Sequence, residues 1–430
     1  MTLRKRLASL AVCTLAVSGA PAQRAASAPF YFAPTTTLTA ETANNTSAAD
    51  SFAGSSNGNL AAGSVSKLPV RSLLYAGANT KILTAMMGWW GKKEHISIGY
   101  RSDDAAQIQR QVDDMVSRGF DGTTLAWYGS DEDELSNKAA KLLMKASERA
   151  GGFAFALRPN EGIIKWSKMG LSPTDTLIFH LKYAAKTYFP SSAYLRIDDR
   201  PVLMFFGFEK YDIDWERLRQ AIGGDPIFVF RNPNGFNYPY SDGAFAWSMV
   251  ADTAYIDRFF DRARHSGGKL AFGNAYKGFD DSAASWTEHR KTDQRCGQTW
   301  LSTMAYAAKY YNSSHQLPFL QVATWNDYEE GTEIETGIDN CLSITPQIDG
   351  GRLRWALSGA GSENTVDHYT VFLSKDGKRL MPLGDVESGT HTFDLPRQLP
   401  VGSWTLFVKA VGRPSIRNVL SAPIAYKVVQ

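Results

Sequence analysis

One short segment gathers acidic side chains directly after an apolar run. Residues 321–337 read QVATWNDYEEGTEIETG, and five carboxylates lie among them: Asp327, Glu329, Glu330, Glu333 and Glu335. Like charges this close repel one another, so a purely structural loop gains nothing from them. Two neighbouring carboxyl groups can instead act as general acid and general base, because the charge of one raises the pKa of the other. Calcium binding is an alternative for an acidic loop, although this spacing differs from that of an EF-hand.

Eight apolar segments alternate with helical patterns along the chain up to this loop. They are residues 81–91, 122–129, 152–158, 193–207 (a turn and then a strand), 225–232, 242–248, 269–278 and 318–325. These segments are apolar on both sides, as parallel strands covered by helices are. Their number predicts an α/β fold, a (β/α)8 barrel over residues 71–345. An open doubly wound sheet is the alternative, but the first strand is not followed by the Gly-rich phosphate loop of a Rossmann fold.

The carboxyl ends of these strands carry many rings and carboxylates, and active-site residues of a barrel lie at those ends. Rings stack on the apolar faces of pyranose units, and carboxylates act on the glycosidic oxygen and on water, so this mixture indicates sugar chemistry. A single one of these tryptophans can instead belong to the core, and His95 can simply bind a loop. Arg158, Asn160 and Glu209 also lie at strand ends. The candidates for substrate binding are Trp89, Trp90, His95, Tyr128, Glu161, Arg231, Trp247, Tyr276, Trp325 and Asn326. No metal or other cofactor is expected.

The segment from Trp325 to Glu335 resembles a motif of two groups of sugar-cleaving enzymes. Trp-Asn-Asp and a following Glu are similar to the endo-α-1,3-glucanases of glycoside hydrolase family 71. Glu-Gly-Thr followed by Ile-Glu is similar to the endo-α-mannosidases of family 99. The resemblance implies an endo-acting hydrolase of an α-linked polysaccharide, α-1,3-glucan or α-mannan, in which Asp327 is the base and Glu330 the general acid. The glucanases imply direct attack by water, and the mannosidases imply attack by the sugar 2-hydroxyl.

The sequence departs from both groups within this motif. Asp327 stands where the mannosidases have the longer Glu, and Glu329 stands where His or Gly is frequent. Glu333 and Glu335 lie farther along the loop, and we expect them to support it rather than to act on substrate. The pattern does not indicate a role for Glu329.

The first 28 residues are typical of a secretory signal peptide. Arg4, Lys5 and Arg6 precede a short apolar run, residues 7–18, and small residues follow. A membrane span needs about 20 apolar residues, and no later run reaches that length. We therefore expect an exported protein, secreted, periplasmic or at the cell surface, without an integral membrane segment.

Cysteine usage fits export. Cys13 would leave with the signal peptide, and Cys296 and Cys341 remain. An even pair in an exported chain predicts a disulfide, with two unrelated buried thiols as the alternative.

Two further segments flank the predicted barrel. Residues 29–70 are rich in Ala, Ser and Thr and are predicted to be a flexible linker. Residues 346–430 hold short runs rich in Thr, Val and aromatic residues, with a hairpin turn at Asp376-Gly377. These runs predict a small β-sandwich of fibronectin or immunoglobulin type.

Bulk composition limits the functional classes. The chain has 430 residues, a net charge of +3 and 43% hydrophobic residues, as an ordinary globular protein of two or three domains has. This charge gives no case for a nucleic-acid partner. We expect a monomer whose ligand is a polysaccharide or oligosaccharide. Two alternatives stay open: a carbohydrate-binding barrel without catalysis, and a cell-surface adhesion or structural protein whose C-terminal β domain is the functional part.

Overall fold

The computed structural model describes residues 36–37, 65–250, 252, 254–285, 287–397 and 399–429. The predicted signal peptide lies outside these residues, as does most of the predicted linker. The last part of that linker is described from Val65, whose side chain is buried, to the start of the single-turn helix η1 (Val70–Leu73).

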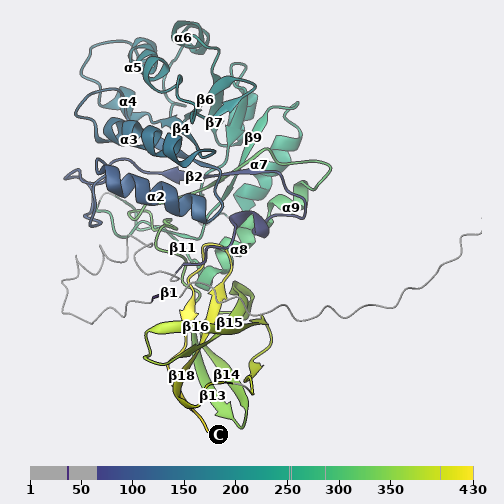
Figure 1. Ribbon diagram of the computed structural model, residues 1–430. Coiled ribbons are helices and arrows are strands. Elements are labelled where there is room, and N and C mark those ends of the chain that lie inside the picture. The colour runs from purple at the N-terminus through teal and green to yellow at the C-terminus, as the bar shows by residue number, and fades with distance from the viewer. Residues whose placement is uncertain are drawn as a thin grey trace, which may run out of the picture. The chain divides into compact units, whose positions relative to one another are not determined.

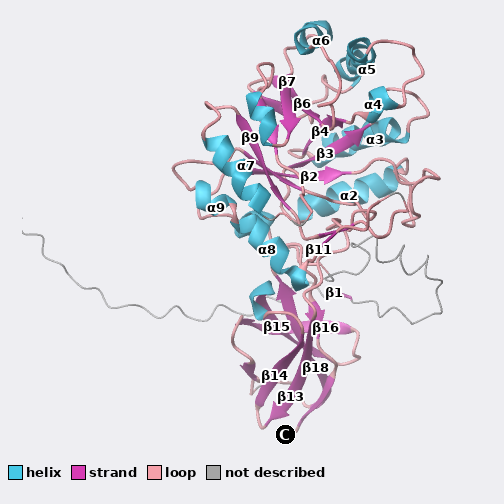
Figure 2. Ribbon diagram, turned by 180° about the vertical axis from the view of Figure 1, so that it is seen from behind, coloured by secondary structure: helices cyan, strands magenta, loops and turns pink. Residues whose placement is uncertain are grey.

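Within the described residues, parallel strands close into a barrel (Figures 1 and 2). Each strand pairs with the next, and the last pairs with the first. A short strand, β5 (Arg196–Ile197), adds to β6 in the antiparallel direction. The predicted (β/α)8 barrel is therefore confirmed. Its strands are β2 (Lys81–Met86), β3 (Gly122–Trp127), β4 (Ala154–Pro159), β6 (Arg200–Phe205), β7 (Ile227–Arg231), β8 (Gly243–Phe245), β9 (Leu270–Ala275) and β12 (Phe319–Val322).

Helices follow the strands and cover the outside of the barrel (Figure 2). Asp104 and Ser172 cap two of them, because their side chains accept hydrogen bonds from backbone N–H groups of the first turn. No helix in the described part of the chain is long and apolar enough to cross a membrane. The helices are α2 (Ala105–Ser117), α3 (Leu135–Ala150), α4 (Gly162–Lys165), α5 (Pro173–Thr187), α6 (Trp215–Ile222), α7 (Ala254–Arg264), α8 (Gln298–Ala305) and α9 (Ala307–Tyr310), with 3-10 turns η2 (Pro233–Asn237) and η3 (Arg295–Gly297).

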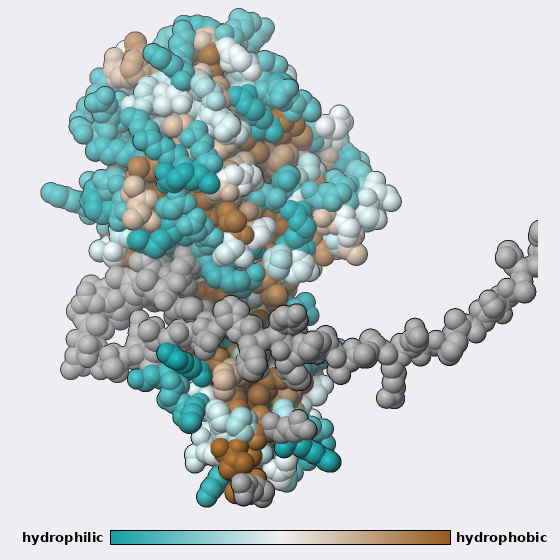
Figure 3. All heavy atoms as spheres, viewed as in Figure 1, coloured by the Kyte–Doolittle hydropathy of each residue, from teal (hydrophilic) through white to brown (hydrophobic). Residues whose placement is uncertain are grey.

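The barrel strands are buried on both faces, which explains their apolar sequences. In β2, Ile82 and Met86 pack outward against the helices, in one cluster with Ile108 of α2. Leu83 and Ala85 point into the barrel and belong to a second cluster. The exterior is mostly hydrophilic on the face shown in Figure 3, with hydrophobic residues in small groups.

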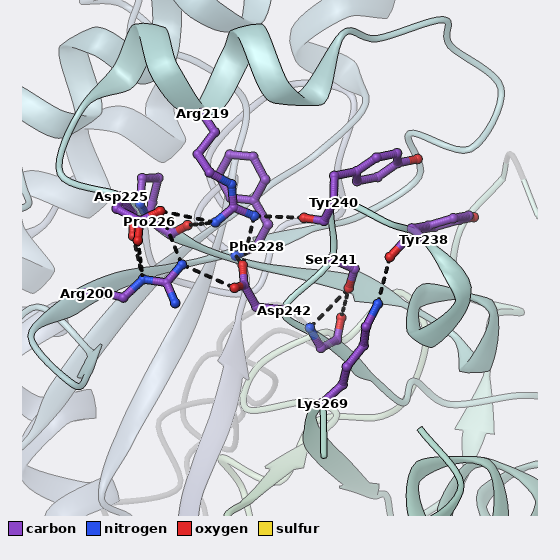
Figure 4. Close-up of polar contacts among 11 residues, drawn as sticks. Arg200, Arg219, Asp225, Pro226, Phe228, Tyr238, Tyr240, Ser241, Asp242 and Lys269 are labelled. Atoms are coloured by element: carbon purple, nitrogen blue, oxygen red, sulfur yellow. Dashed lines mark hydrogen bonds and ion pairs between the residues drawn. The ribbon is translucent and has the colours of Figure 1, made fainter. Parts of the chain in front are cut away.

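A polar network ties the amino ends of three neighbouring strands together (Figure 4). Asp242, directly before β8, accepts hydrogen bonds from the Phe228 N–H of β7 (2.8 Å) and from Arg200 Nη2 of β6 (3.1 Å). Arg219 of α6 donates to the same carboxylate (2.8 Å) and to the Pro226 carbonyl (2.6 Å). This is the end of the barrel opposite to the usual active-site face, so the network serves stability.

The C-terminal residues form antiparallel sheets. The first holds β13 (Leu342–Asp349), β14 (Arg352–Gly359) and β17 (Thr392–Asp394). The second holds β15 (Val366–Ser374), β16 (Arg379–Glu387), β18 (Gly402–Gly412), β19 (Val419–Leu420) and β20 (Ile424–Val428), and β1 (Thr36–Thr37) pairs with β16. A 3-10 turn, η4 (Glu363–Thr365), precedes β15.

The two C-terminal sheets share one buried cluster, in which Leu353 and Trp355 meet Tyr369, Val371 and Leu406. This is a β domain, and its fibronectin or immunoglobulin type stays a prediction. Its β15–β16 hairpin turns at Asp376-Gly377, as the sequence predicts.

The predicted disulfide is present. It joins Cys296, within η3, to Cys341, directly before β13, across a sequence separation of 45 residues. The bond therefore closes a loop that includes the acidic segment.

Removing this disulfide should destabilise the protein. On the chain-entropy account, closing a loop of this size lowers the entropy of the unfolded chain and stabilises the fold by about 4 kcal/mol. We expect a Cys296→Ser, Cys341→Ser variant to unfold at a lower urea concentration than the oxidised protein, followed by circular dichroism. Equal midpoints with and without the bridge would contradict the expectation.

Candidate active site

A cavity of about 150 Å³ lies at the carboxyl ends of the barrel strands. A second cavity of about 280 Å³ shares two wall residues with it, Asn160 and Phe206, and adds Glu161, Glu209, Lys210 and Arg231. The two cavities therefore adjoin each other. The first is lined by Met87, Trp89, Ala126, Tyr128, Arg158, Asn160, Phe206, Trp247, Asp327, Glu329 and Glu330.

The loop after β12 folds into a compact turn that brings Asp327 and Glu330 to one cavity. The Asp327 N–H donates to Thr324 Oγ1 (2.9 Å), and the Glu330 N–H donates to Asp327 Oδ1 (3.2 Å). Gly331 has a φ of 58°, which a glycine adopts without strain. A side chain there would also meet the Asp280 carbonyl, because an added Cβ would lie 2.9 Å from that oxygen.

A hairpin that the sequence analysis did not predict supports this loop from the side. Strands β10 (Phe279–Asp280) and β11 (Lys291–Thr292) pair in the segment after β9. The Asp280 N–H donates to the Glu330 carbonyl (2.8 Å). Within the hairpin, the buried Asp281 carboxylate forms an ion pair with Arg290 (2.9 Å). The backbone of Glu330 is thus fixed while its carboxyl group stays at the cavity.

Burial changes the proton affinity of both carboxyl groups. It raises the pKa of Asp327 well above its ordinary value, and the charge of Glu330 raises it further. Burial also raises the pKa of Glu330, to about 7, although the positive charge of Arg290 opposes the shift. The two groups titrate together, so the values belong to the pair. Near neutral pH the pair retains a proton, as an acid and base couple requires.

Arg158 places a buried positive charge in the same cavity wall. Its side chain comes from β4, and its guanidinium lies 4.4 Å from the centroid of the Trp247 ring. It donates long hydrogen bonds to Thr124 Oγ1 and Met87 Sδ, both at 3.5 Å. Burial lowers the pKa of Arg158 to about 10, so the group remains charged at neutral pH. Because these two hydrogen bonds are weak, the N–H groups of the Arg158 guanidinium can donate to oxygen atoms of a ligand instead.

Glu329 holds the loop after β2 in place. Its carboxylate receives the Ile96 N–H (3.0 Å) and contacts His95 Nδ1 (2.7 Å). The His95 ring in turn stacks on Trp89, with centroids 5.1 Å apart. This arrangement gives Glu329 the role that the sequence pattern did not indicate, since it orients an aromatic wall of the cavity.

The remaining acids of the loop have structural partners, as expected from their positions. Glu333 forms an ion pair with Lys277 (2.7 Å). Glu335 is buried and accepts hydrogen bonds from the Tyr328 hydroxyl (2.8 Å), the Tyr100 hydroxyl (2.9 Å) and Gln111 Nε2 (3.0 Å). Burial raises the pKa of Glu335 to about 7.

The structure distributes the substrate-binding candidates over four kinds of position. Trp89, Tyr128 and Trp247 line the first cavity beside the two carboxyl groups, whereas Glu161 and Arg231 line the second. His95 stacks on Trp89 and is not among the residues that line either cavity. The walls of these two cavities, as formed by the described residues, do not include the buried Trp90, Tyr276, Trp325 and Asn326.

Two of these four have clear structural roles. Asn326 accepts from the Met87 N–H (2.7 Å) and donates to the Met87 carbonyl (3.2 Å), which fastens the acidic loop to the end of β2. Trp325 packs edge-on against Phe120, with Arg118 on its ring. Sequence reasoning missed Phe206, Lys210 and the neighbouring Trp166.

Among the residues that the structure describes, no group of three or more His, Cys, Asp or Glu side chains is placed to hold a metal ion.

Comparisons with known proteins give only weak likenesses. No family model matches the sequence, and no curated protein matches it. A solved structure of the GH99 endo-α-mannosidase from Bacteroides thetaiotaomicron is 16% identical, over 60% of this chain and 88% of that chain, with a TM-score of 0.48. A GH27 β-L-arabinopyranosidase from Geobacillus stearothermophilus is 8% identical, over 80% of this chain and 98% of that chain, with a TM-score of 0.35. Both TM-scores are below 0.5, and neither likeness assigns a function to this chain.

Proposed function

We propose that the protein is an exported, endo-acting glycoside hydrolase that cleaves an α-linked polysaccharide of the α-1,3-glucan or α-mannan type. The observation that carries the proposal is the pair Asp327 and Glu330. Two carboxyl groups with raised pKa values share a ring-lined cavity at the carboxyl ends of a barrel. Glycosidic cleavage by acid and base requires such a pair.

Glu330 acts as the general acid in this proposal, and Asp327 as the base. Glu330 is the more exposed of the two carboxyl groups, so a leaving glycosidic oxygen can reach it more easily. It protonates the glycosidic oxygen as the C–O bond breaks. Asp327 takes a proton from the nucleophile, which is either water or the sugar 2-hydroxyl, and water finally adds to the sugar.

In the substrate-free protein, burial alone favours Asp327 as the group that holds the last proton of the pair. The proposed roles are the reverse, because they require that proton on Glu330. The two groups exchange that proton within one coupled system. The position of each carboxyl group relative to the bound sugar then decides which one donates. The assignment of Glu330 as the acid and Asp327 as the base follows the resemblance of the motif and the greater exposure of Glu330.

The walls of the cavities fit a carbohydrate chain. Trp89, Tyr128 and Trp247 offer ring faces for the apolar sides of pyranose units. Arg158 offers donors to sugar oxygens, and the adjoining second cavity offers room and charged groups for further units. This additional space beyond the first cavity supports the binding of more than one sugar unit.

Export and accessory roles belong to the same proposal. A disulfide is compatible with an oxidising compartment. We place the protein outside the cytoplasm, as a monomer whose β domain is a spacer or carbohydrate-binding accessory.

A glycan panel tests the proposal. Purified protein is incubated with α-1,3-glucan and α-mannan, and the products are separated by size. We expect a ladder of oligosaccharides, because internal bonds are cut. Binding of a glycan without any product would instead indicate a carbohydrate-binding protein. If the protein neither binds nor cleaves these glycans, the proposal of a carbohydrate ligand is wrong.

The activity should rise with pH through about pH 7. Glu330 loses its proton near pH 7, and burial raises the pKa of Asp327 as well, so at low pH both carboxyl groups are protonated and no base remains. The pair gains a base and keeps one proton once the first proton has left. The measurement is kcat/KM against pH. Glu335→Gln is the control, because burial raises the pKa of Glu335 to about 7 as well. A kcat/KM that falls as the pH rises through 7 would contradict the assignment of this titration to Glu330 and Asp327. Loss of the rise in the Glu335→Gln protein would contradict it as well.

A further inference from the structure

Trp166 is an exposed tryptophan beside the proposed active site. It ends α4 in the segment after β4, and 60% of its surface is exposed. Two more exposed apolar side chains follow it before α5, Met169 (37%) and Leu171 (49%). Exposed apolar patches mark binding sites, and these three side chains lie within one short segment of the chain.

The Trp166 ring continues the aromatic wall of the first cavity. It stacks on Tyr128, with ring centroids 5.4 Å apart and planes inclined by 26°. Tyr128 lines that cavity and meets Trp89 edge-on, with centroids 5.9 Å apart. Rings therefore run without a break from the carboxyl pair to the exterior.

The backbone near Trp166 is shaped to allow this stacking. A Cβ added to Gly162 would lie 2.5 Å from the Trp166 ring and 2.6 Å from the Tyr128 ring, distances that real Cβ atoms do not show. Only glycine at this position lets the two rings meet. The Lys165 ammonium lies over the Trp166 ring, 5.7 Å from its centroid, and supplies a hydrogen-bond donor beside it.

We propose that Trp166, stacked on Tyr128, is an additional subsite that binds a pyranose unit of the carbohydrate chain outside the cavity. The inference rests on the proposed function, which it extends from a cavity to a longer cleft. The ring face covers the apolar side of the sugar, and Lys165 donates to its hydroxyl groups. Because the stacked rings are already ordered, little conformational entropy is lost on binding. Continuity with the sugar cavity favours a sugar over a protein as the occupant.

The test measures binding without cleavage. Glu330→Gln protein, with and without Trp166→Ala, is titrated with α-1,3-gluco-oligosaccharides and α-manno-oligosaccharides of increasing length. We expect Trp166→Ala to weaken binding of the longer chains about tenfold, the usual effect of losing an aromatic stacking contact. The loss should be smaller for the shortest chains that bind.

Phe179→Ala is the matched control, because Phe179 on α5 is 52% exposed and does not line the cavities as the described residues form them. It should bind chains of every length like its parent. Equal affinity of the Trp166→Ala protein for long chains would overturn the subsite. If the wild-type protein cleaves nothing but Trp166→Ala still weakens the binding of long chains more than that of short chains, the subsite is supported and the proposed hydrolase activity is refuted. A complete lack of binding by the parent would overturn both.

Discussion

Replacing Glu330 by glutamine is expected to lower kcat/KM for polysaccharide cleavage about a thousandfold, within the usual range for loss of a general acid or base. The amide has nearly the shape of the carboxyl group but cannot donate the proton that the leaving oxygen needs. Reducing ends released per unit time measure the loss, at the pH optimum of the wild-type protein. Asp327→Asn should lose activity by a similar factor, since it removes the base.

Glu333→Gln provides the matched control for this prediction. Glu333 belongs to the same loop, but its carboxylate pairs with Lys277 instead of lining the cavity. Its substitution should cost far less activity than that of Glu330. Comparable losses in the two variants would mean that the loop, and not the carboxyl group of Glu330, carries the effect.

Replacing Arg118 by alanine is expected to lower the free energy of unfolding by about 3–5 kcal/mol, as the removal of one partner from a buried ion pair does. Arg118 directly follows α2, and its fully buried side chain pairs with Asp114 of that helix. Its guanidinium also donates to the Ile334 carbonyl (2.7 Å) and the Glu335 carbonyl (2.6 Å). The substitution leaves two buried carbonyls without these donors, and it leaves the buried Asp114 carboxylate with the half-exposed Lys67 as its charged partner.

Urea denaturation gives the size of this loss, and Arg217→Ala is its control. Arg217 pairs with Asp175 at the surface, where both side chains are exposed, and such pairs contribute at most about 1 kcal/mol. Similar stability losses in the two variants would show that Arg118 does not hold the acidic loop as described.

The barrel follows from the sequence because its strands are buried on both faces. An inward Leu83 beside an outward Ile82 produces an unbroken apolar run, which is the pattern of a covered parallel strand. Ser172 with Pro173 marks a helix start for a local reason, hydrogen bonding to the first turn. Strand ends are harder to predict. The predicted strand 81–91 ends at Met86, because the apolar residues after it enter a loop.

Only part of the candidate site can be predicted from the sequence, because its remaining features depend on contacts between distant residues. Trp89 and Trp90 are neighbours of the same type, yet one lines the cavity and the other is buried in the barrel interior. The role of Glu329 depends on the contact of its carboxylate with His95, which is 234 positions away in the sequence. Trp166 follows the short helix α4, whose few residues give no periodic pattern.

The most direct test of the proposed acid compares leaving groups. Aryl glycosides of the oligosaccharide that the protein releases are made with leaving groups that do or do not need protonation. Glu330→Gln should cleave the most acidic aryl leaving group nearly as fast as the wild type and should fail with alkyl leaving groups. Asp327→Asn should be slow with both. A Glu330→Gln protein that loses the same factor for every leaving group, or leaving-group dependence in Asp327→Asn instead, would contradict the roles assigned to the two carboxyl groups.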